Sequence, residues 1–371
     1  MEACMGFLDR LDPDILLKIF TYVDDPYDLV RVSSISRSWQ HFVIANGLWK
    51  QLCLRKFSQL SRVAHVVELN KCWAVDAVQV GSSYSKEWEY LERDDRAYAL
   101  LARASTTFTD RDCILKAISA SSTDNYPQES IYNTLHPANN VRWRASYWSS
   151  KGQSNPAVPE TLEYKLVDEF CVITEINLRP FQVYFDKGLP ICSAKSVRFR
   201  VGHPKSPTDS GNDLPGYSLP DSADDKFVWT YTSQEFPMAQ ESHLQKFRLP
   251  EPVLCVGGIL QIELLGRVHR CEIDGLYYIC ISFVQVLGRP LSPAFGVEIL
   301  EPCGKFVLKI KNHRPFELQA QSNHTALAQL QKHLRDLQHI SYIANMLHGN
   351  GNLVVNIDES EMDEGEDEYL L

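Results

Sequence analysis

Two hydrophobic periodicities divide the chain. Up to about residue 57, apolar residues recur at spacings of three and four, which is typical of helices that bury one face. From about residue 120, apolar and polar residues alternate, which is the pattern of strands with one buried face. The sequence therefore predicts an α+β multidomain protein, with an all-α part followed by an all-β part.

The N-terminal part contains clear helix starts. In Asp12-Pro13 and Asp25-Pro26 the aspartate can cap a helix, and proline costs no hydrogen bond at the first helical position. A third helical segment carries apolar residues from Trp39 to Leu52. Three short helices cannot bury this apolar surface on themselves, so we expect the unit to pack on a neighbour or partner.

The alternating segments predict a sandwich or jelly roll, because they are short and are separated by turns that contain proline or glycine. The predicted strands are 162–166, 172–178, 196–201, 226–231, 259–264 and 276–286. The segment 203–225 is rich in proline and glycine and predicts a mobile insertion.

The remaining segments connect or follow these two parts. An amphipathic helix is expected from Glu87 to Ala104, inside a linker that fixes the distance between two functional ends. Strands are expected at 297–300 and 306–310, followed by a helix and a disordered acidic tail. The predicted division is 1–57 helical domain, 58–118 helical linker, 119–293 jelly roll, 294–348 C-terminal strands and helix, and 349–371 tail.

Charge and composition narrow the function. The formal net charge is −10, but eight acids between Asp358 and Glu368 supply most of it. The rest is near neutral and has no basic stripe, so we expect no nucleic-acid partner. No apolar run reaches the length of a membrane span, and residues 1–5 do not resemble a secretory signal. The ten cysteines form no C-x-x-C pair and are expected to be buried thiols, which favours the nucleus or cytoplasm.

The N-terminal motifs are similar to an F-box. The matching stretches are Leu11–Phe20, Asp25–Arg31, Ser34–Trp39 and Leu48-Trp49, with Asp12 inserted before the usual proline and Ser36 where cysteine is common. The resemblance implies docking to a Skp-type adaptor and, through it, a cullin–RING ubiquitin ligase. Which of the apolar residues face the adaptor and which face the domain's own core stays open. The candidates are Leu11, Pro13, Ile15, Leu16, Ile19, Leu29, Val32, Ile35, Trp39 and Trp49.

The β-rich part resembles a galactose-binding-like (discoidin-type) jelly roll. The motifs are Ala120–Pro127, Tyr147–Gly152, Leu162–Leu166 and the final strand up to Pro290, although Lys165 replaces the family's usual aspartate. An F-box followed by such a domain resembles a group of plant F-box proteins. In that fold, ligands bind at loops on one end, which implies a candidate ligand loop suited to sugars, acidic peptides or phosphorylated groups. Its residues are Arg142, Trp143, Arg144, Tyr147 and Trp148.

Two interpretations of that loop stay open, since Trp148 can instead be a core residue, which we favour for this side chain, and the two arginines can pair with surface acids. We find no G-x-S-x-G, H-E-x-x-H or phosphate-loop motif. His269, Cys271 and Asp274 are close in sequence, but a turn before the last long strand explains them better than a Cys–His nucleophile. We therefore expect no catalysis, no cofactor and no metal.

The predicted function is the substrate-recognition subunit of an SCF-type (Skp-adaptor, cullin, F-box) E3 ubiquitin ligase. The F-box would dock the adaptor, and the jelly roll would bind an unknown protein or glycoprotein. The alternative is a carbohydrate- or phospho-ligand-binding module that acts outside a ligase.

Overall fold

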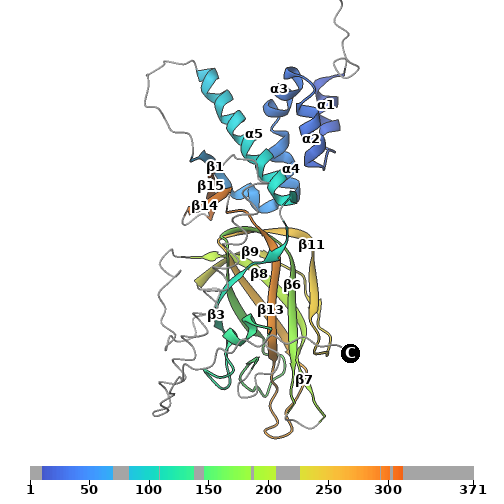
Figure 1. Ribbon diagram of the computed structural model, residues 1–371, viewed down its shortest axis with the longest axis vertical. Helices are drawn as coiled ribbons and strands as arrows, with labels where there is room; N and C mark the ends of the chain where they lie inside the picture. The colour runs from blue at the N-terminus through green and yellow to red at the C-terminus, as the bar shows by residue number, and fades with distance from the viewer. Residues whose placement is uncertain are drawn as a thin grey trace, which may run out of the picture.

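The protein is elongated, with helices at one end and a β-sandwich at the other (Figure 1). The computed structural model describes residues 11–69, 83–107, 109–137, 146–184, 188–205, 226–292, 294–300 and 304–311. Within these ranges, no helix is both long and apolar enough to cross a membrane. The predicted insertion beyond residue 205, the C-terminal helix and the acidic tail lie outside the described residues.

Four helices form the N-terminal unit, namely α1 (Pro13–Phe20), α2 (Pro26–Ser33), α3 (Arg37–Ala45) and α4 (Leu48–Lys56). The side chains of Asp12 and Asp25 each accept a hydrogen bond of 2.8 Å from a backbone amide two residues on, as the capping signals predict. The predicted third helix is divided in two, because Gly47 adopts a left-handed conformation with φ of 56°.

The described part of the segment predicted as a linker contains a short helix, a strand and a long helix, and then reaches the first strands of the sandwich. After a short 3₁₀ helix (Ser58–Arg62), β1 (Val63–Glu68) joins a three-stranded sheet with β14 (Phe295–Leu300) and β15 (Lys305–Ile310) in the order β1-β15-β14. The amphipathic helix is confirmed as α5 (Ser83–Thr107), and it packs against α4. The described residues of this segment therefore belong to packed elements of the fold.

The sandwich consists of two six-stranded antiparallel sheets. One sheet has the order β10-β8-β12-β5-β3, with β9 also on β8, and the other has the order β11-β6-β13-β2, with β4 on β13 and β7 on β6. The first comprises β3 (Ile114–Ala120), β5 (Glu160–Leu166), β8 (Ala194–Pro204), β9 (Phe227–Thr232), β10 (Phe236–Pro237) and β12 (Ile259–Arg267). The second comprises β2 (Arg111–Asp112), β4 (Trp148–Ser149), β6 (Phe170–Gln182), β7 (Ile191–Cys192), β11 (Gln245–Val256) and β13 (Cys280–Pro290).

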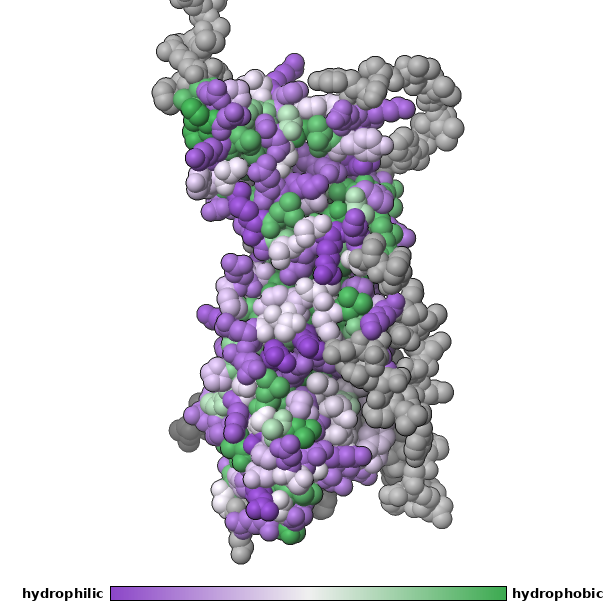
Figure 2. Space-filling model, turned by 180° about the vertical axis from the view of Figure 1, so that it is seen from behind, coloured by the Kyte–Doolittle hydropathy of each residue, from purple (hydrophilic) through white to green (hydrophobic). Residues whose placement is uncertain are grey.

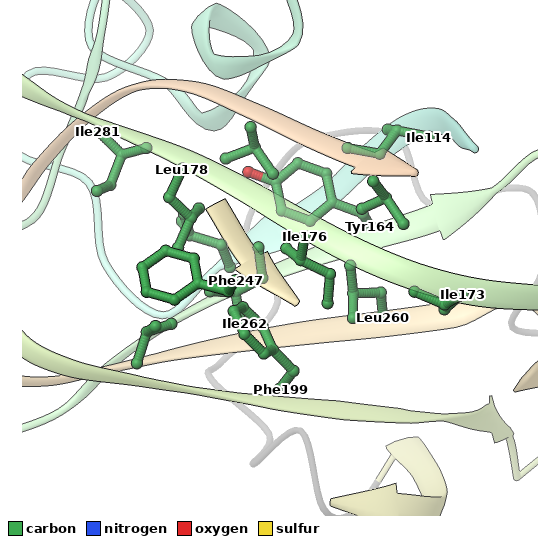
Figure 3. Close-up of a cluster of buried hydrophobic side chains, with 14 of the residues drawn as sticks. Ile114, Tyr164, Ile173, Ile176, Leu178, Phe199, Phe247, Leu260, Ile262 and Ile281 are labelled. Atoms are coloured by element: carbon green, nitrogen blue, oxygen red, sulfur yellow. The ribbon is translucent and has the colours of Figure 1, made fainter. Parts of the chain in front are cut away.

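All six strands predicted from alternation are present, so the fold class is confirmed. The last begins later than predicted, at Cys280, because the residues before it form a turn in which Tyr277 makes only isolated bridges to Gln153 and Arg270. Side chains from both sheets meet in the interior, as Figure 3 shows for Ile176, Phe199 and Leu260. Alternating residues of each strand therefore fill one shared core.

A second core runs from the helices into the sandwich. It joins Leu52 of α4 and Leu101 of α5 to Phe306 of β15, and continues through Phe170 of β6 and Leu254 of β11. All five side chains are essentially inaccessible to solvent. The helical end and the sandwich are therefore connected by continuous packing.

Candidate functional site

Large apolar side chains are exposed on the first two helices and the turn that follows them. Ile15 is 51% exposed, Ile19 45% and Ile35 61%, although α1 and α2 bury other apolar residues on their inner faces. Figure 2 shows apolar side chains gathered at this end of the molecule. We call this set the α1–α2 apolar surface; it comprises Ile15, Ile19, Tyr22, Tyr27, Val30 and Ile35.

The residues predicted to face an adaptor divide into two groups. Pro13, Ile15, Ile19 and Ile35 are exposed, and Leu11, Leu16, Val32 and Trp39 are half-buried. Leu29 and Trp49, by contrast, are only 1% and 3% exposed. These two belong to the core of the helical unit, which corrects their assignment as docking residues.

The half-buried Trp39 has a structural reason for its position. Its ring meets Phe20 edge-on, with the two ring centroids 5.3 Å apart. This contact holds α1 against α3 and so fixes the orientation of the exposed face of α1.

A cavity of about 460 Å³ borders the α1–α2 apolar surface. Val30 belongs to both, because it lines the cavity and is also partly exposed. The walls come from the end of α2, the turn after it, one side of α3, the start of α4, and α5. The lining residues are Val30, Ser33, Ser34, Ser36, Arg37, Gln40, Val43, Trp49 and Asp95.

Asp95 of α5 is the unusual member of this lining. Its Oδ1 atom is buried and has no hydrogen-bond partner among the residues that the structure describes. Burial raises the pKa of the Asp95 carboxyl to about 7, which nearby Glu92 reinforces and Arg96 opposes. A carboxyl in this environment is poised between its neutral and charged forms near neutral pH.

Asp95 is not among the predicted site residues, although the sequence carries a signal for it. Leu91, Tyr98 and Ala102 are apolar at helical spacing, and Asp95 occupies the same face of α5. A charged residue at a core position of an amphipathic helix is a candidate for a specific role.

The predicted ligand loop is corrected for its two described residues. Trp148 is fully buried, and its indole Nε1 donates a hydrogen bond of 3.1 Å to the carbonyl of Ser122. Tyr147 stacks on Phe181 with ring centroids 3.9 Å apart, and its hydroxyl donates to Glu129. Trp148 belongs to the core of the sandwich and Tyr147 to a smaller buried cluster with Phe181, so neither ring is available to a ligand. The other three, Arg142, Trp143 and Arg144, lie outside the described residues.

The His269–Asp274 segment is a turn, as predicted. The Cys271 amide donates to the carbonyl of Leu276 at 2.8 Å, and Gly275 takes a left-handed conformation with φ of 73°. The Asp274 carboxylate accepts a hydrogen bond of 2.5 Å from the Tyr278 hydroxyl. Hydrogen bonding to Tyr278 and to the Leu276 amide lowers the pKa of Asp274. These bonds close the turn.

Comparison with known proteins defines the class of this helical unit. A family model described as F-box-like matches residues 8–55, which cover α1 to α4 nearly to their end. The chain is also 45% identical over 372 residues to F-box protein At4g00755 of Arabidopsis thaliana, and the match covers 98% of each chain. The protein belongs to the F-box protein family.

Solved structures similar to this chain cover about half of it. The family 32 CBM from C. perfringens NanJ, solved in complex with galactose, is 13% identical and covers 48% of this chain and 98% of its own, with a TM-score of 0.30. A fragment of a putative chitobiase from Bacteroides thetaiotaomicron is 10% identical and covers 50% of this chain and 96% of its own, with a TM-score of 0.33.

Proposed function

We propose that this protein is the substrate-recognition subunit of an SCF-type E3 ubiquitin ligase. Helices α1 to α3 dock a Skp-type adaptor, and the sandwich binds the target protein. The observation that carries the proposal is the exposure of Ile15, Ile19 and Ile35 within the region that matches the F-box-like model. Clustered exposed apolar side chains are typical of protein-binding surfaces.

The energetics of these side chains support docking. Fully burying an isoleucine contributes about 1.5–3 kcal/mol relative to leaving it exposed. Charged residues lie beside the apolar ones, for example Asp28 and Arg31, which form an exposed ion pair of 2.7 Å. An apolar centre with a charged rim is the usual anatomy of a protein interface.

The shape of the molecule suits a subunit that connects two partners. The α1–α2 apolar surface lies at one end, and the loops of the sandwich farthest from it lie at the other (Figure 1). Such a subunit accelerates a reaction by raising the local concentration of a target near the enzyme that modifies it. It needs no catalytic residue of its own.

The direct test measures the affinity of the full-length protein for a recombinant Skp-type adaptor by calorimetry. In Ile15→Ala/Ile19→Ala we expect a loss of about 30-fold or more, because interface hot spots are worth about 2 kcal/mol or more. Folding should be retained, because both side chains are exposed. Ile273→Ala is the matched control, since Ile273 is 89% exposed in the turn before β13.

Two results would contradict the proposal. One is a wild-type protein that does not bind the adaptor. The other is an α1 double variant that binds as tightly as Ile273→Ala, because the surface named here would then not be the docking surface.

A further inference from the structure

The cavity beside the α1–α2 apolar surface is lined by a carboxylate whose Oδ1 atom has no partner in the described part of the chain. Asp95 supplies it from α5, outside the residues that match the F-box-like model. Leaving a buried carboxylate oxygen without a hydrogen bond is costly, so the charged form of Asp95 is not fully compensated by the described residues.

Two of the cavity's hydroxyl groups, those of Ser33 and Ser34, are not available to Asp95 as donors. The Ser33 hydroxyl donates to the carbonyl of Leu29 at 2.9 Å, and the Ser34 hydroxyl donates to the carbonyl of Val30 at 2.8 Å. Since each hydroxyl carries one proton, both are already used.

The cationic side chains near Asp95 are either paired with other carboxylates or exposed to solvent. On α5, Arg96 pairs with Glu68 of β1 at 3.0 Å, and the remaining close charge, Glu92, is of the same sign as Asp95. On α4, Lys50 pairs with Asp94 at 3.6 Å. On α3, Arg37 lines the cavity with an exposed side chain, and the residues of α2 that line it carry no charge.

We propose that Asp95 receives a lysine or arginine side chain of the adaptor that docks on the α1–α2 apolar surface. The proposal rests on the function proposed above and adds a polar subsite from α5 to it. The cavity is continuous with that surface at Val30, so a side chain of the docked partner can enter it. Val43 and Trp49 offer apolar walls for the aliphatic stem, and the carboxylate of Asp95 accepts from its cationic head.

The subsite makes docking sensitive to pH. Only the ionised carboxylate pairs with a cation, and the pKa of Asp95 in the free protein is about 7. The fraction of molecules in which Asp95 is ionised therefore rises about tenfold between pH 6 and pH 8. The affinity for the adaptor should rise with this fraction. Above pH 8 the affinity should level off.

The test compares the full-length wild type, Asp95→Asn and Asp94→Asn for binding to a recombinant Skp-type adaptor between pH 6 and pH 8.5. The wild type should bind about tenfold more tightly at pH 8 than at pH 6. Asp95→Asn should bind tenfold or more weakly than wild type at pH 8 and should lack the rise with pH. Asp94→Asn is the matched control on the same helix, and it should keep the rise because Asp94 is not a lining residue.

A stability measurement separates a lost contact from a lost fold. The pKa of Asp95 is raised on folding, so the folded protein holds this proton more tightly and the free energy of unfolding falls as pH rises from about 4 to 7. Asp95→Asn removes this fall, so at pH 8 the variant should be at least as stable as wild type. A weaker affinity at that pH then reports the missing carboxylate.

Three outcomes would overturn the proposal. In the first, Asp95→Asn binds with the affinity and pH profile of wild type, while the α1 double variant still loses binding; docking then stands without this subsite. In the second, Arg37→Gln abolishes the rise with pH although Asp95 is intact, which makes Arg37 the partner of Asp95. In the third, wild type binds no adaptor at any pH, and the proposed function fails together with the subsite.

Discussion

Individual side chains show how environment decides the role of a residue type. Trp148 is a core residue although it borders a predicted ligand loop, and Asp95 is a carboxylate with a buried oxygen on an otherwise apolar face of α5. Arg267 is a third case, because its side chain is fully buried and pairs with Glu160, which also accepts a hydrogen bond of 2.8 Å from Ser122. Buried charges of this kind are paired because unpaired ones are costly.

Trp148 should matter for stability. Trp148→Ala would leave a cavity in the sandwich core and an unpaired Ser122 carbonyl, so we expect the free energy of unfolding to fall by about 3–5 kcal/mol in urea titrations. Tyr184→Ala is the control, since Tyr184 is exposed, and it should change stability by less than about 0.5 kcal/mol. Equal effects of the two substitutions would show that Trp148 is not the core residue described here.

The sequence predicts which residues form the apolar set of the F-box, but not which of them are exposed and which are buried. Ile19 and Leu29 are both aliphatic residues of short helices, yet one is exposed and the other is buried. Periodicity gives each helix one apolar face, and it contains no information about which neighbour covers that face. The division depends on contacts between helices, such as Phe20 with Trp39, that the spacing does not encode.

Among the elements, α5 shows that a sequence pattern can predict a helix without predicting its packing partner. Its amphipathic pattern predicts the helix, and the structure confirms it, but the pattern does not predict that the helix packs on α4. Nor does the sequence predict that β1 pairs in parallel with β15, because the pairing joins distant segments, Val66 with Leu308. Local signals specify an element, whereas its neighbours are set by the whole chain.

Small residues on α5 let it approach its neighbours closely. Ala97, Ala102 and Ala104 are all buried in the core that α5 shares with α4. Ala97→Leu should therefore overpack this contact and lower the free energy of unfolding by about 1–3 kcal/mol. Ala45→Leu places the same side chain at an exposed position of α3 and should be nearly neutral. A neutral Ala97→Leu would mean that α5 has room to move away from α4.

For the whole molecule, the continuous core determines how the two ends are related. Phe170 of the sandwich packs edge-on against Phe295 of the three-stranded sheet, with ring centroids 6.0 Å apart. Residues of α4 and α5 complete the same cluster. The F-box and the sandwich are therefore held in one relative orientation, and the distance between the α1–α2 apolar surface and the far loops of the sandwich is built into the fold.

The core shared by the helical end and the sandwich predicts cooperative unfolding across the molecule. Phe295→Ala should cost about 3–5 kcal/mol and should lower amide-exchange protection in α4 and β6 together, with a single thermal transition. Phe199→Ala removes a ring from the core confined to the sandwich, so its largest loss of protection should lie in β8 and β12. Two separate transitions in wild type, or loss of protection in only one unit of Phe295→Ala, would contradict a shared core.

The pairing of β1 with β15 also has a consequence for protein synthesis. A ribosome releases the four F-box helices and β1 early, but β1 has no partner strand until Lys305–Ile310 has emerged. Until then, the apolar side chains of α4 and α5 that meet Phe306 and Leu308 are uncovered. A chain interrupted before residue 305 would carry the F-box motif without its supporting sheet, and its exposed core would be open to chaperones and proteases. The last strand of the described fold thus completes the support of the first domain, and the α1–α2 apolar surface has this support only after β15 has been made.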